Sequence, residues 1–447
     1  MESTTEPTLE SSKKQLLHRM ADPINAIAFA LIGLALRLWH LGQPKGYIFD
    51  EVYYAQNAHS LASHGVEVNA KGLADFIVHP PVGKWLIALG IKAFGFNEFG
   101  WRVSSAVIGS FSIALIYLVA KKLFNNRLIS SSAAILTLAD GLHLVHSRVA
   151  LLDIFLMFFT LLAFYLILHA RYWLAGIALG LASGVKWSGL YYFLAYFCFI
   201  FYVDFRHAQA MENPSPFMST LRSKFAKRAA QFGVIPVLTY LLTWTGWFIT
   251  TTGWDRTWSK NIFTSFWHYQ SEIFNFHKNL VDKHSYSANP WSWLMQGRPT
   301  SFFYATPKGC GSSSCSQEIL ALGTPFLWWS GAIAIAITFG YWISRREWQS
   351  GLLLLSLAAG YLPWFLFQRR TMFSFYSIAF EPFLILIICF VIAKFLEDEG
   401  RRAMRERIVY GYLTLIVLCF IYFSPLYLGE VITYSNWLSH MWLPSWI

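Results

Sequence analysis

The sequence predicts an all-α polytopic membrane protein with about 11 transmembrane helices and further helices on the outer membrane surface. Of its 447 residues, 55% are hydrophobic, 13% are charged and 18% are aromatic. The mean hydropathy is +0.43, and apolar stretches of about 20 residues, the length that crosses a bilayer, recur along the chain. This composition excludes an ordinary soluble domain.

The basic character of the chain is also explained by a membrane. The formal net charge is +11, but the lysines and arginines cluster in short segments between apolar stretches, where they set orientation and meet lipid headgroups. No basic stripe carries the interleaved aromatic residues of a nucleic-acid-binding module. We therefore expect no nucleic-acid partner.

Eleven segments are predicted to span the membrane. They lie near residues 23–42, 101–121, 128–146, 150–169, 171–185, 187–204, 230–251, 322–343, 349–367, 373–394 and 408–428. Residues 23–428 are therefore interpreted as the transmembrane domain. Residues 1–22 form an N-terminal tail, and residues 429–447 form a C-terminal tail.

The distribution of positive charge predicts the orientation. Lys13, Lys14 and Arg19 precede the first span, and the positive-inside rule places such segments in the cytoplasm. An odd number of spans then puts the C-terminus outside, together with two large loops, 43–100 and 253–321. In the first loop we expect a helix over 52–64 and an interfacial helix over 81–94.

The adjacent acids Asp50 and Glu51 lie in the first outer loop, and carboxylates near a span of such a protein are scarce. A solvated cap of a loop helix explains the pair equally well when it is taken alone. Further ionisable residues, however, are predicted at the same depth. They are His79, Lys84, Arg102, Arg148, Asp153, Lys186, Arg369 and Arg370. Each could snorkel to headgroups or pair with a neighbour, but together they predict a site.

This pattern suits glycosyl transfer from a lipid phosphate. Arginine and lysine side chains neutralise a phosphate at headgroup depth, while a carboxylate deprotonates a weak acceptor hydroxyl. A sugar phosphate is already a fair leaving group, so this chemistry requires no cofactor. A divalent metal between the acid pair and the phosphate stays an alternative that we do not predict, because no further acidic ligands are evident.

The cysteines fall into two groups. Cys310 and Cys315 flank a polar turn in the second outer loop, where a disulfide is expected. Cys198, Cys389 and Cys419 fall inside apolar stretches and are interpreted as core residues. No cysteine and histidine pattern has the spacing of a zinc site.

A series of short motifs resembles the protein O-mannosyltransferase family, the dolichyl- or polyprenyl-phosphate-mannose-dependent enzymes of the GT-C fold. In chain order the motifs are Phe49-Asp-Glu-Val52, Val78-His-Pro-Pro-Val-Gly-Lys84, Trp101-Arg-Val103, Ser147-Arg-Val-Ala-Leu-Leu-Asp153 and Val185-Lys-Trp187. Segments 270–280, 290–299 and 361–376 continue the likeness, which extends over about residues 48 to 383.

The resemblance implies inverting transfer of mannose from polyprenyl-phosphate-mannose to Ser or Thr hydroxyls of exported proteins. It implies Asp50 as the catalytic base, Glu51 as a residue that orients the base or the acceptor, and Arg102 as a ligand of the donor phosphate. By position, the phosphate side also includes Arg148, Lys186 and Arg369. The resemblance also gives supporting roles to Lys84, to Asp153 and to His79, which it places on the acceptor side.

One departure from the family concerns the second outer loop. Eukaryotic members carry a β-trefoil MIR domain there, and residues 253–321 are too few to hold one. The chain therefore resembles a bacterial, actinobacterial-type member with its active site at the extracytoplasmic face of the cell membrane. The implied partners are the lipid donor, Ser/Thr-containing acceptor proteins and membrane lipids, with the secretion translocon as a candidate.

Two other functions stay open. A different GT-C transferase would move another lipid-linked sugar to a lipid or glycan; the acid pair suits it, but segments 78–84 and 270–280 favour protein mannosylation. A lipid or solute transporter would place charges near the membrane midplane and show repeated halves. Here Arg37 is the main charge away from the outer face, and no internal repeat is evident.

Overall fold

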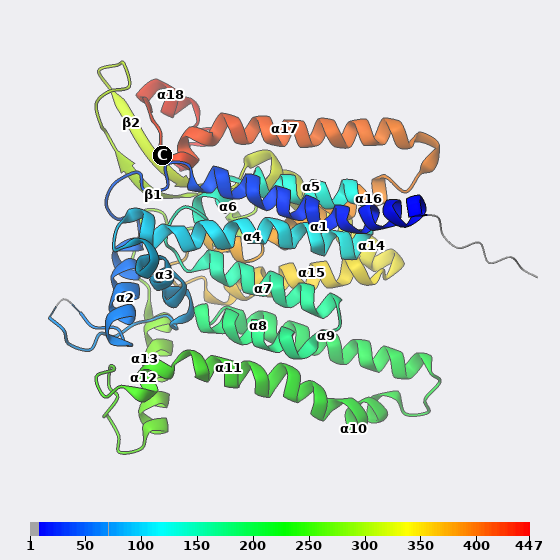
Figure 1. The fold of residues 1–447 in the computed structure, drawn as a ribbon, viewed down its shortest axis with the longest axis horizontal. Coiled ribbons are helices and arrows are strands. Elements are labelled where there is room, and N and C mark those ends of the chain that lie inside the picture. Colours follow the sequence, from blue (N-terminus) through cyan, green and yellow to red (C-terminus); the bar gives the residue numbers. More distant parts are fainter. Residues whose placement is uncertain (1–8, 70) are drawn as a thin grey trace, which may run out of the picture.

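A bundle of long helices forms the body of the protein (Figure 1). The computed structural model describes residues 9–69 and 71–447, with side chains from residue 20 onward. The side chains of Lys13, Lys14 and Arg19, and residues 1–8 of the expected N-terminal tail, lie outside the described part. The bundle helices are α1 (Leu9–Leu38), α4 (Glu98–Phe124), α5 (Arg127–Leu138), α6 (Gly141–His146), α7 (Asp153–Leu168), α8 (Tyr172–Val185), α9 (Gly189–Ala210), α10 (Pro216–Ala229), α11 (Ile235–Thr243), α14 (Pro325–Arg345), α15 (Trp348–Tyr361), α16 (Glu381–Phe395) and α17 (Arg402–Leu428).

The predicted fold class is confirmed, and a helix occurs at each of the eleven predicted spans. Five helices in the described residues are long and apolar enough to cross a membrane: Met20–Leu38, Glu98–Phe124, Pro325–Arg345, Trp348–Phe367 and Glu399–Leu428. Most of the other predicted spans correspond to shorter or interrupted helices, for example η1 (Ala230–Val234) running into α11, whereas α9 is a continuous helix of 22 residues. The number of spans therefore stays a prediction.

The segment predicted as one span over 128–146 is divided into α5 and α6 by Asp140. Its carboxylate caps α6 by accepting a hydrogen bond from the backbone N–H of His143 at 3.3 Å. It also accepts from the Thr324 backbone N–H and from the Trp328 indole, at 2.8 and 3.0 Å. A capping aspartate of this kind ends one helix and starts the next, which hydropathy alone does not reveal.

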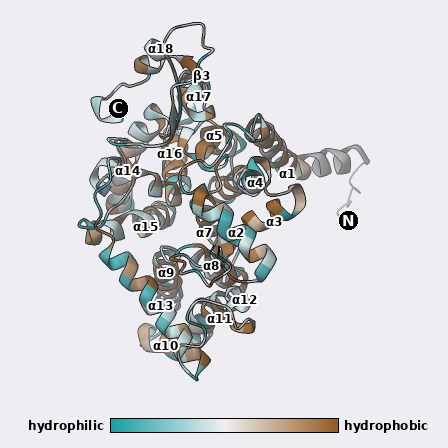
Figure 2. Cartoon of the chain, turned by 90° about the vertical axis from the view of Figure 1, so that its left-hand side faces the viewer, coloured by the Kyte–Doolittle hydropathy of each residue, from teal (hydrophilic) through white to brown (hydrophobic). Residues whose placement is uncertain are grey.

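Short helices collect at one end of the bundle, on the left of Figure 1. They are α2 (Glu51–His64), α3 (Val82–Phe94), α12 (Thr245–Ile249) and α13 (Ile262–Asn279). Two short 3-10 helices, η3 (Leu362–Phe367) and η4 (Ser374–Ala379), lie in the chain between α15 and α16. The helices expected over 52–64 and 81–94 are thus confirmed as α2 and α3. In Figure 2, which looks onto this end, α2 and α13 carry mixed polar and apolar residues.

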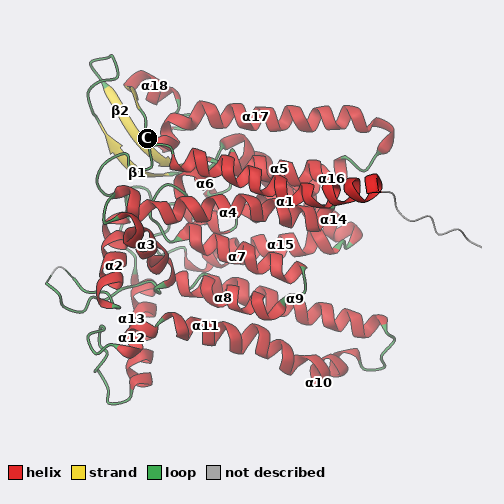
Figure 3. Ribbon diagram, in the orientation of Figure 1, coloured by secondary structure: helices red, strands yellow, loops and turns green. Residues whose placement is uncertain are grey.

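A small antiparallel sheet at the same end was not predicted from the sequence. It contains β1 (Thr300–Ala305), β2 (Cys315–Ala321) and β3 (Val431–Thr433) in the order β1-β2-β3, and Figure 3 shows it beside α18 (Tyr434–Ser439). The β1–β2 hairpin is closed by the expected Cys310–Cys315 disulfide. Strand β2 is almost continuously buried, so its sequence lacks the alternation that identifies a half-exposed strand.

The one charge that stood apart from the outer face, Arg37, is fully buried between helices. Its guanidinium lies 2.7 Å from Nδ1 of His143 and donates to the Gly33 carbonyl at 3.1 Å. Because a guanidinium only donates, His143 Nδ1 accepts and its Nε2–H donates to the Ser112 hydroxyl at 2.8 Å. This network joins α1, α4 and α6.

Candidate functional site

Glu51 and Arg102 form a buried ion pair at the start of α2. Both side chains are completely buried, and the guanidinium donates from Nε and Nη2 to the two carboxylate oxygens, each at 2.8 Å. The same carboxylate accepts from the backbone N–H groups of Ile48 and Ala150 at 2.9 Å. Glu51 therefore joins three segments of the chain, and it is not a solvated cap.

The remaining donors of Arg102 hold the loop that leads into α2. Nη1 donates to the carbonyls of Leu41 and Pro44, and Nη2 also donates to the carbonyl of Gly46, at 2.9 to 3.2 Å. A guanidinium has five N–H groups, and here all of them are directed at protein acceptors. The expectation that Arg102 binds the donor phosphate does not fit this geometry.

Arg148 is also occupied by the protein. Its guanidinium donates to the carbonyls of Leu36 and Arg37 in the last turn of α1 and to those of Trp39 and His40 just beyond it. Carbonyls in the last turn of a helix have no partner within that helix. A cation is favourable at a helix C-terminus. Arg148 therefore caps α1, and the expectation of a phosphate ligand does not fit it either.

Asp50 is the acid of the pair that stays unbonded. It occupies the N-cap position of α2 but makes no capping hydrogen bond, and in the described part of the chain no ion pair engages its carboxylate. Phe49 before it has a φ of +49°, a left-handed conformation that a non-glycine residue adopts at a cost of about 1–2 kcal/mol. The Phe49 ring stacks on Phe302 at 4.7 Å and packs edge-on against Phe375 at 5.6 Å. This aromatic cluster fixes the backbone from which the Asp50 side chain projects.

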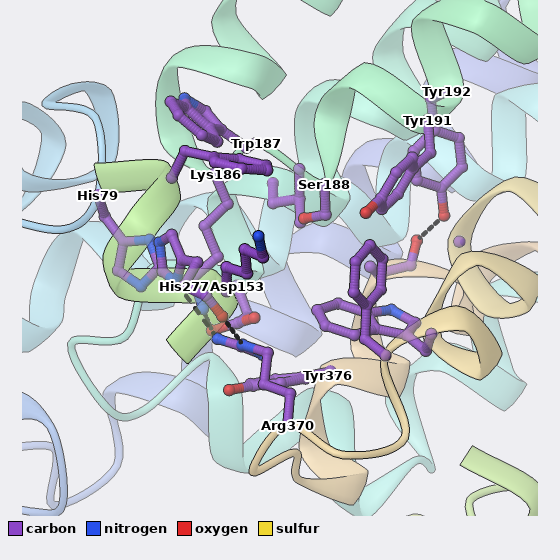
Figure 4. Close-up of a pocket in the computed structure, with 17 residues that line it drawn as sticks. His79, Asp153, Lys186, Trp187, Ser188, Tyr191, Tyr192, His277, Arg370 and Tyr376 are labelled. Atoms are coloured by element: carbon purple, nitrogen blue, oxygen red, sulfur yellow. Dashed lines mark hydrogen bonds and ion pairs between the residues drawn. The ribbon is translucent and has the colours of Figure 1, made fainter. Parts of the chain in front are cut away.

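The Asp50 carboxyl interacts electrostatically with two charged residues that line a nearby cavity. Burial raises its pKa to about 6, and the charges of Lys186 and Asp153 act on it in opposite directions. Those two residues line a cavity of about 180 Å³, shown in Figure 4. A carboxyl of this kind is ionised at neutral pH yet basic enough to take a proton.

Three cations and one carboxylate line the cavity, among aromatic side chains. The charged residues are Asp153, Lys186, Lys278 and Arg370. Asp153 is the first residue of α7, and Lys186 directly follows α8. The Lys186 ammonium donates to the Asp153 carboxylate at 2.7 Å and lies 5.3 Å from the Tyr376 ring centroid. The cavity therefore carries an excess of positive charge in an aromatic surrounding.

Arg370, and not Arg369, reaches the cavity. Arg369 is exposed, and it was the residue expected from the sequence. The Arg370 guanidinium donates to the His277 carbonyl at 3.1 Å and lies 3.3 Å from His277 Nδ1. Its buried Nη1 has no partner in the described part of the chain. Arg370 is thus held in place with the two N–H groups of Nη1 available.

His79 and Lys84 have different roles in the structure. The Lys84 ammonium is buried, where it binds Glu67 and the backbone carbonyl of His79, so it supports the loop. The His79 imidazole lines the cavity, with its centroid 5.0 Å from that of His277. Burial, followed by the charge of Lys186, holds the pKa of His79 well below its usual range, so the imidazole is neutral.

An apolar groove adjoins the cavity. It has a volume of about 530 Å³ and is lined by residues of α9, α11 and α13. Trp187 and Phe274 line both spaces. A tyrosine in the groove, Tyr240, accepts from the Trp187 indole at 3.1 Å and donates to Gln270 at 2.6 Å.

Sequence reasoning gave no role to four residues of this site: Arg370, which was noted as an outer charge beside Arg369, and His277, Tyr376 and Trp187. Each lies in or beside a motif that was noted, but none belongs to a charge pattern that distinguishes it from its neighbours. Among the described residues, no group of three or more His, Cys, Asp and Glu side chains is arranged to hold a metal ion.

Two family models match the chain. Residues 27–250 match the dolichyl-phosphate-mannose-protein mannosyltransferase model, and residues 262–446 match the C-terminal four-transmembrane region of protein O-mannosyltransferase. The polyprenol-phosphate-mannose–protein mannosyltransferase of Mycolicibacterium smegmatis is 33% identical, over 95% of this chain and 92% of its own length. The protein of that name from Corynebacterium glutamicum is 30% identical, over 89% and 88%.

Solved structures show the same fold. The S. cerevisiae protein O-mannosyltransferase Pmt1-Pmt2 complex bound to the sugar donor has a TM-score of 0.80 at 16% identity, covering 99% of this chain and 93% of that one. ArnT from Cupriavidus metallidurans bound to undecaprenyl phosphate has a TM-score of 0.56 at 12% identity, covering 90% and 70%. The fold is that of GT-C membrane glycosyltransferases, and the chain belongs to the protein O-mannosyltransferase family.

Proposed function

We propose that the protein transfers mannose from polyprenyl-phosphate-mannose to Ser or Thr hydroxyls of exported proteins, with Asp50 as the catalytic base. The observation that carries this proposal is an unbonded carboxylate with a raised pKa beside a cavity lined by three cations. The mycobacterial and corynebacterial relatives are polyprenol-phosphate-mannose–protein mannosyltransferases, and from them we take the donor and the protein acceptor.

In the reaction, the acceptor hydroxyl lies beside Asp50 and its oxygen attacks the anomeric carbon of mannose. Asp50 takes the hydroxyl proton as the new carbon–oxygen bond forms. The bond from the anomeric carbon to the phosphate oxygen breaks, and polyprenyl phosphate leaves with the bonding electron pair. A single displacement of this kind inverts the anomeric configuration.

The donor phosphate is assigned to Lys186 and Arg370. The Lys186 ammonium also binds Asp153, and both N–H groups of Arg370 Nη1 are free of protein partners in the described part of the chain. Both side chains are charged donors of the kind that phosphates bind. The polyprenyl chain occupies the adjoining apolar groove past Trp187. Glu51 and Arg102 act as positioning residues that hold the start of α2, and His79 faces the acceptor as a neutral imidazole.

The positive-inside rule supports an orientation with the N-terminus in the cytoplasm. In that orientation the end of the bundle that carries α2, α3 and α13 is extracytoplasmic, as are the cavity and the C-terminal tail (Figure 1). Acceptor segments then meet the site after they have been exported across the cell membrane.

The test is transfer of radiolabelled mannose from polyprenyl-phosphate-mannose to a Ser/Thr-rich peptide by the purified chain. Asp50→Asn should lower the rate by at least a hundredfold, because general-base catalysis contributes about 10²–10⁴. Asp282→Asn is the matched control: it changes an exposed acid of the second outer loop and should leave the rate unchanged. Donor consumption without peptide labelling would instead indicate a lipid or glycan acceptor, and a near-normal rate for Asp50→Asn would refute the base.

A further inference from the structure

A second large cavity lies at the end of the bundle opposite the candidate site. It has a volume of about 1030 Å³ and forms where the end of α7, the second half of α9 and the turn between α14 and α15 meet. These segments lie toward the right of Figure 1, away from α2, α3 and α13. The proposed mannosyl transfer does not use this space.

Two arginines line the cavity without a carboxylate partner in the described part of the chain. Arg206 contacts only the Tyr202 hydroxyl, at 3.5 Å, and the Arg346 guanidinium lies 5.0 Å from the Trp342 ring centroid. The one acid in the lining, Glu347, is paired with Lys394 at 2.7 Å. Two positive charges therefore remain uncompensated at the cavity.

The rest of the lining has the character of a lipid environment. Tyr172, Tyr202, Trp342 and Trp348 line the cavity, and aromatic residues of this kind are typical of the membrane–water interface. The lining also includes aliphatic side chains of α9 and α15, among them Leu352 and Leu355. Apolar walls together with interfacial aromatics and two arginines match a lipid with an anionic headgroup.

We propose that this cavity binds an anionic phospholipid from the leaflet opposite the active site, with its phosphate held by Arg206 and Arg346. A two-chain phospholipid is favoured over a polyprenyl phosphate because the cavity has about twice the volume of the groove assigned to the single polyprenyl chain, 1030 against 530 Å³. Guanidinium groups bind phosphate oxygens by paired, charge-assisted hydrogen bonds.

Native mass spectrometry of the delipidated full-length chain tests the proposal, with phosphatidylglycerol as the probe and phosphatidylcholine for comparison. We expect one retained phosphatidylglycerol with at least a tenfold preference over phosphatidylcholine. The double variant Arg206→Gln/Arg346→Gln should lose that preference. The control Arg345→Gln/Arg407→Gln removes equal charge from exposed arginines that do not line the cavity, and it should keep the preference.

A second variant distinguishes binding of the lipid headgroup from binding of the acyl chains. Leu355→Trp places a large ring in the apolar part and should abolish retention of either lipid, while leaving both arginines. The proposal is overturned if Leu355→Trp retains phosphatidylglycerol, if the double variant keeps its preference, or if the control loses it equally. Displacement of phosphatidylglycerol by an equal concentration of polyprenyl phosphate would also overturn it, since the occupant would then be the carrier lipid.

Discussion

Replacing Arg102 by glutamine separates a positioning role from a phosphate-binding role. The wild-type guanidinium satisfies both oxygens of a fully buried carboxylate and three loop carbonyls. Arg102→Gln leaves the Glu51 charge buried without its counter-ion. If Arg102 holds the start of α2, the variant should lose stability; if Arg102 binds the donor, the variant should lose donor affinity while remaining stable.

The size of the effect follows from the bonds that remain. Removing one partner of a buried ion pair costs about 3–5 kcal/mol. Glu51 keeps its two backbone N–H donors, from Ile48 and Ala150, so we expect the lower end, about 3 kcal/mol. That is roughly a hundredfold change in the ratio of folded to unfolded protein. The double variant Glu51→Gln/Arg102→Gln removes the buried charge as well and should recover part of this loss.

The assay measures thermal unfolding of the purified protein in detergent beside the KM for polyprenyl-phosphate-mannose. We expect Arg102→Gln to unfold at a clearly lower temperature and its folded fraction to bind donor with a nearly unchanged KM. Wild-type thermal stability combined with a tenfold higher donor KM would refute the positioning role and restore the phosphate role to Arg102.

The other predictions concern the cavity itself. Arg370→Gln should raise the donor KM at least tenfold, because a hydrogen bond to a charged group contributes about 1.5–3 kcal/mol. The neighbouring control Arg369→Gln alters an exposed side chain and should leave the donor KM unchanged. If both variants raise KM equally, Arg370 does not bind the donor. The transfer rate should fall as the pH drops below about 6, because burial raises the pKa of Asp50 to about 6 and only the ionised carboxylate accepts a proton. Below that pH, kcat/KM should decline tenfold per pH unit. A decline centred near pH 4 would contradict the prediction. Transfer should survive EDTA, since the proposed chemistry depends on cations of the protein, and loss of labelling that returns with added Mg²⁺ or Mn²⁺ would show a metal requirement.

Hydropathy predicted the helices well because a bilayer demands a narrow range of lengths. The segment expected over 101–121 is α4 (Glu98–Phe124), and the segment expected over 150–169 is α7 (Asp153–Leu168). The break at Asp140 was not predicted because hydropathy does not detect a capping side chain, and the same carboxylate also binds Thr324 and Trp328, which lie far along the chain. A local pattern carries no information about such partners.

Which cations face the cavity could be predicted only in part. Lys186 was expected and lines it, whereas the adjacent residues Arg369 and Arg370 are indistinguishable in the sequence. They lie in an irregular segment where no helical periodicity predicts a face. The burial of Arg102 could not be predicted for another reason: it follows from the way residues 41–46 fold over the side chain, which is a tertiary effect.

The aromatic cluster around Phe49 joins residues that the ribosome adds to the chain at very different times. Phe49 is held by Phe302 on β1 and Phe375 on η4, and about 250 residues separate it from the first of these. At about 5–20 residues per second, the ribosome needs tens of seconds to produce that stretch. Until then Phe49 lacks both aromatic partners, and the start of α2 is held only by groups from the first part of the chain, among them the Glu51–Arg102 pair. If Asp50 is the base, the nascent chain therefore completes its site only after Phe302 and Phe375 have been added.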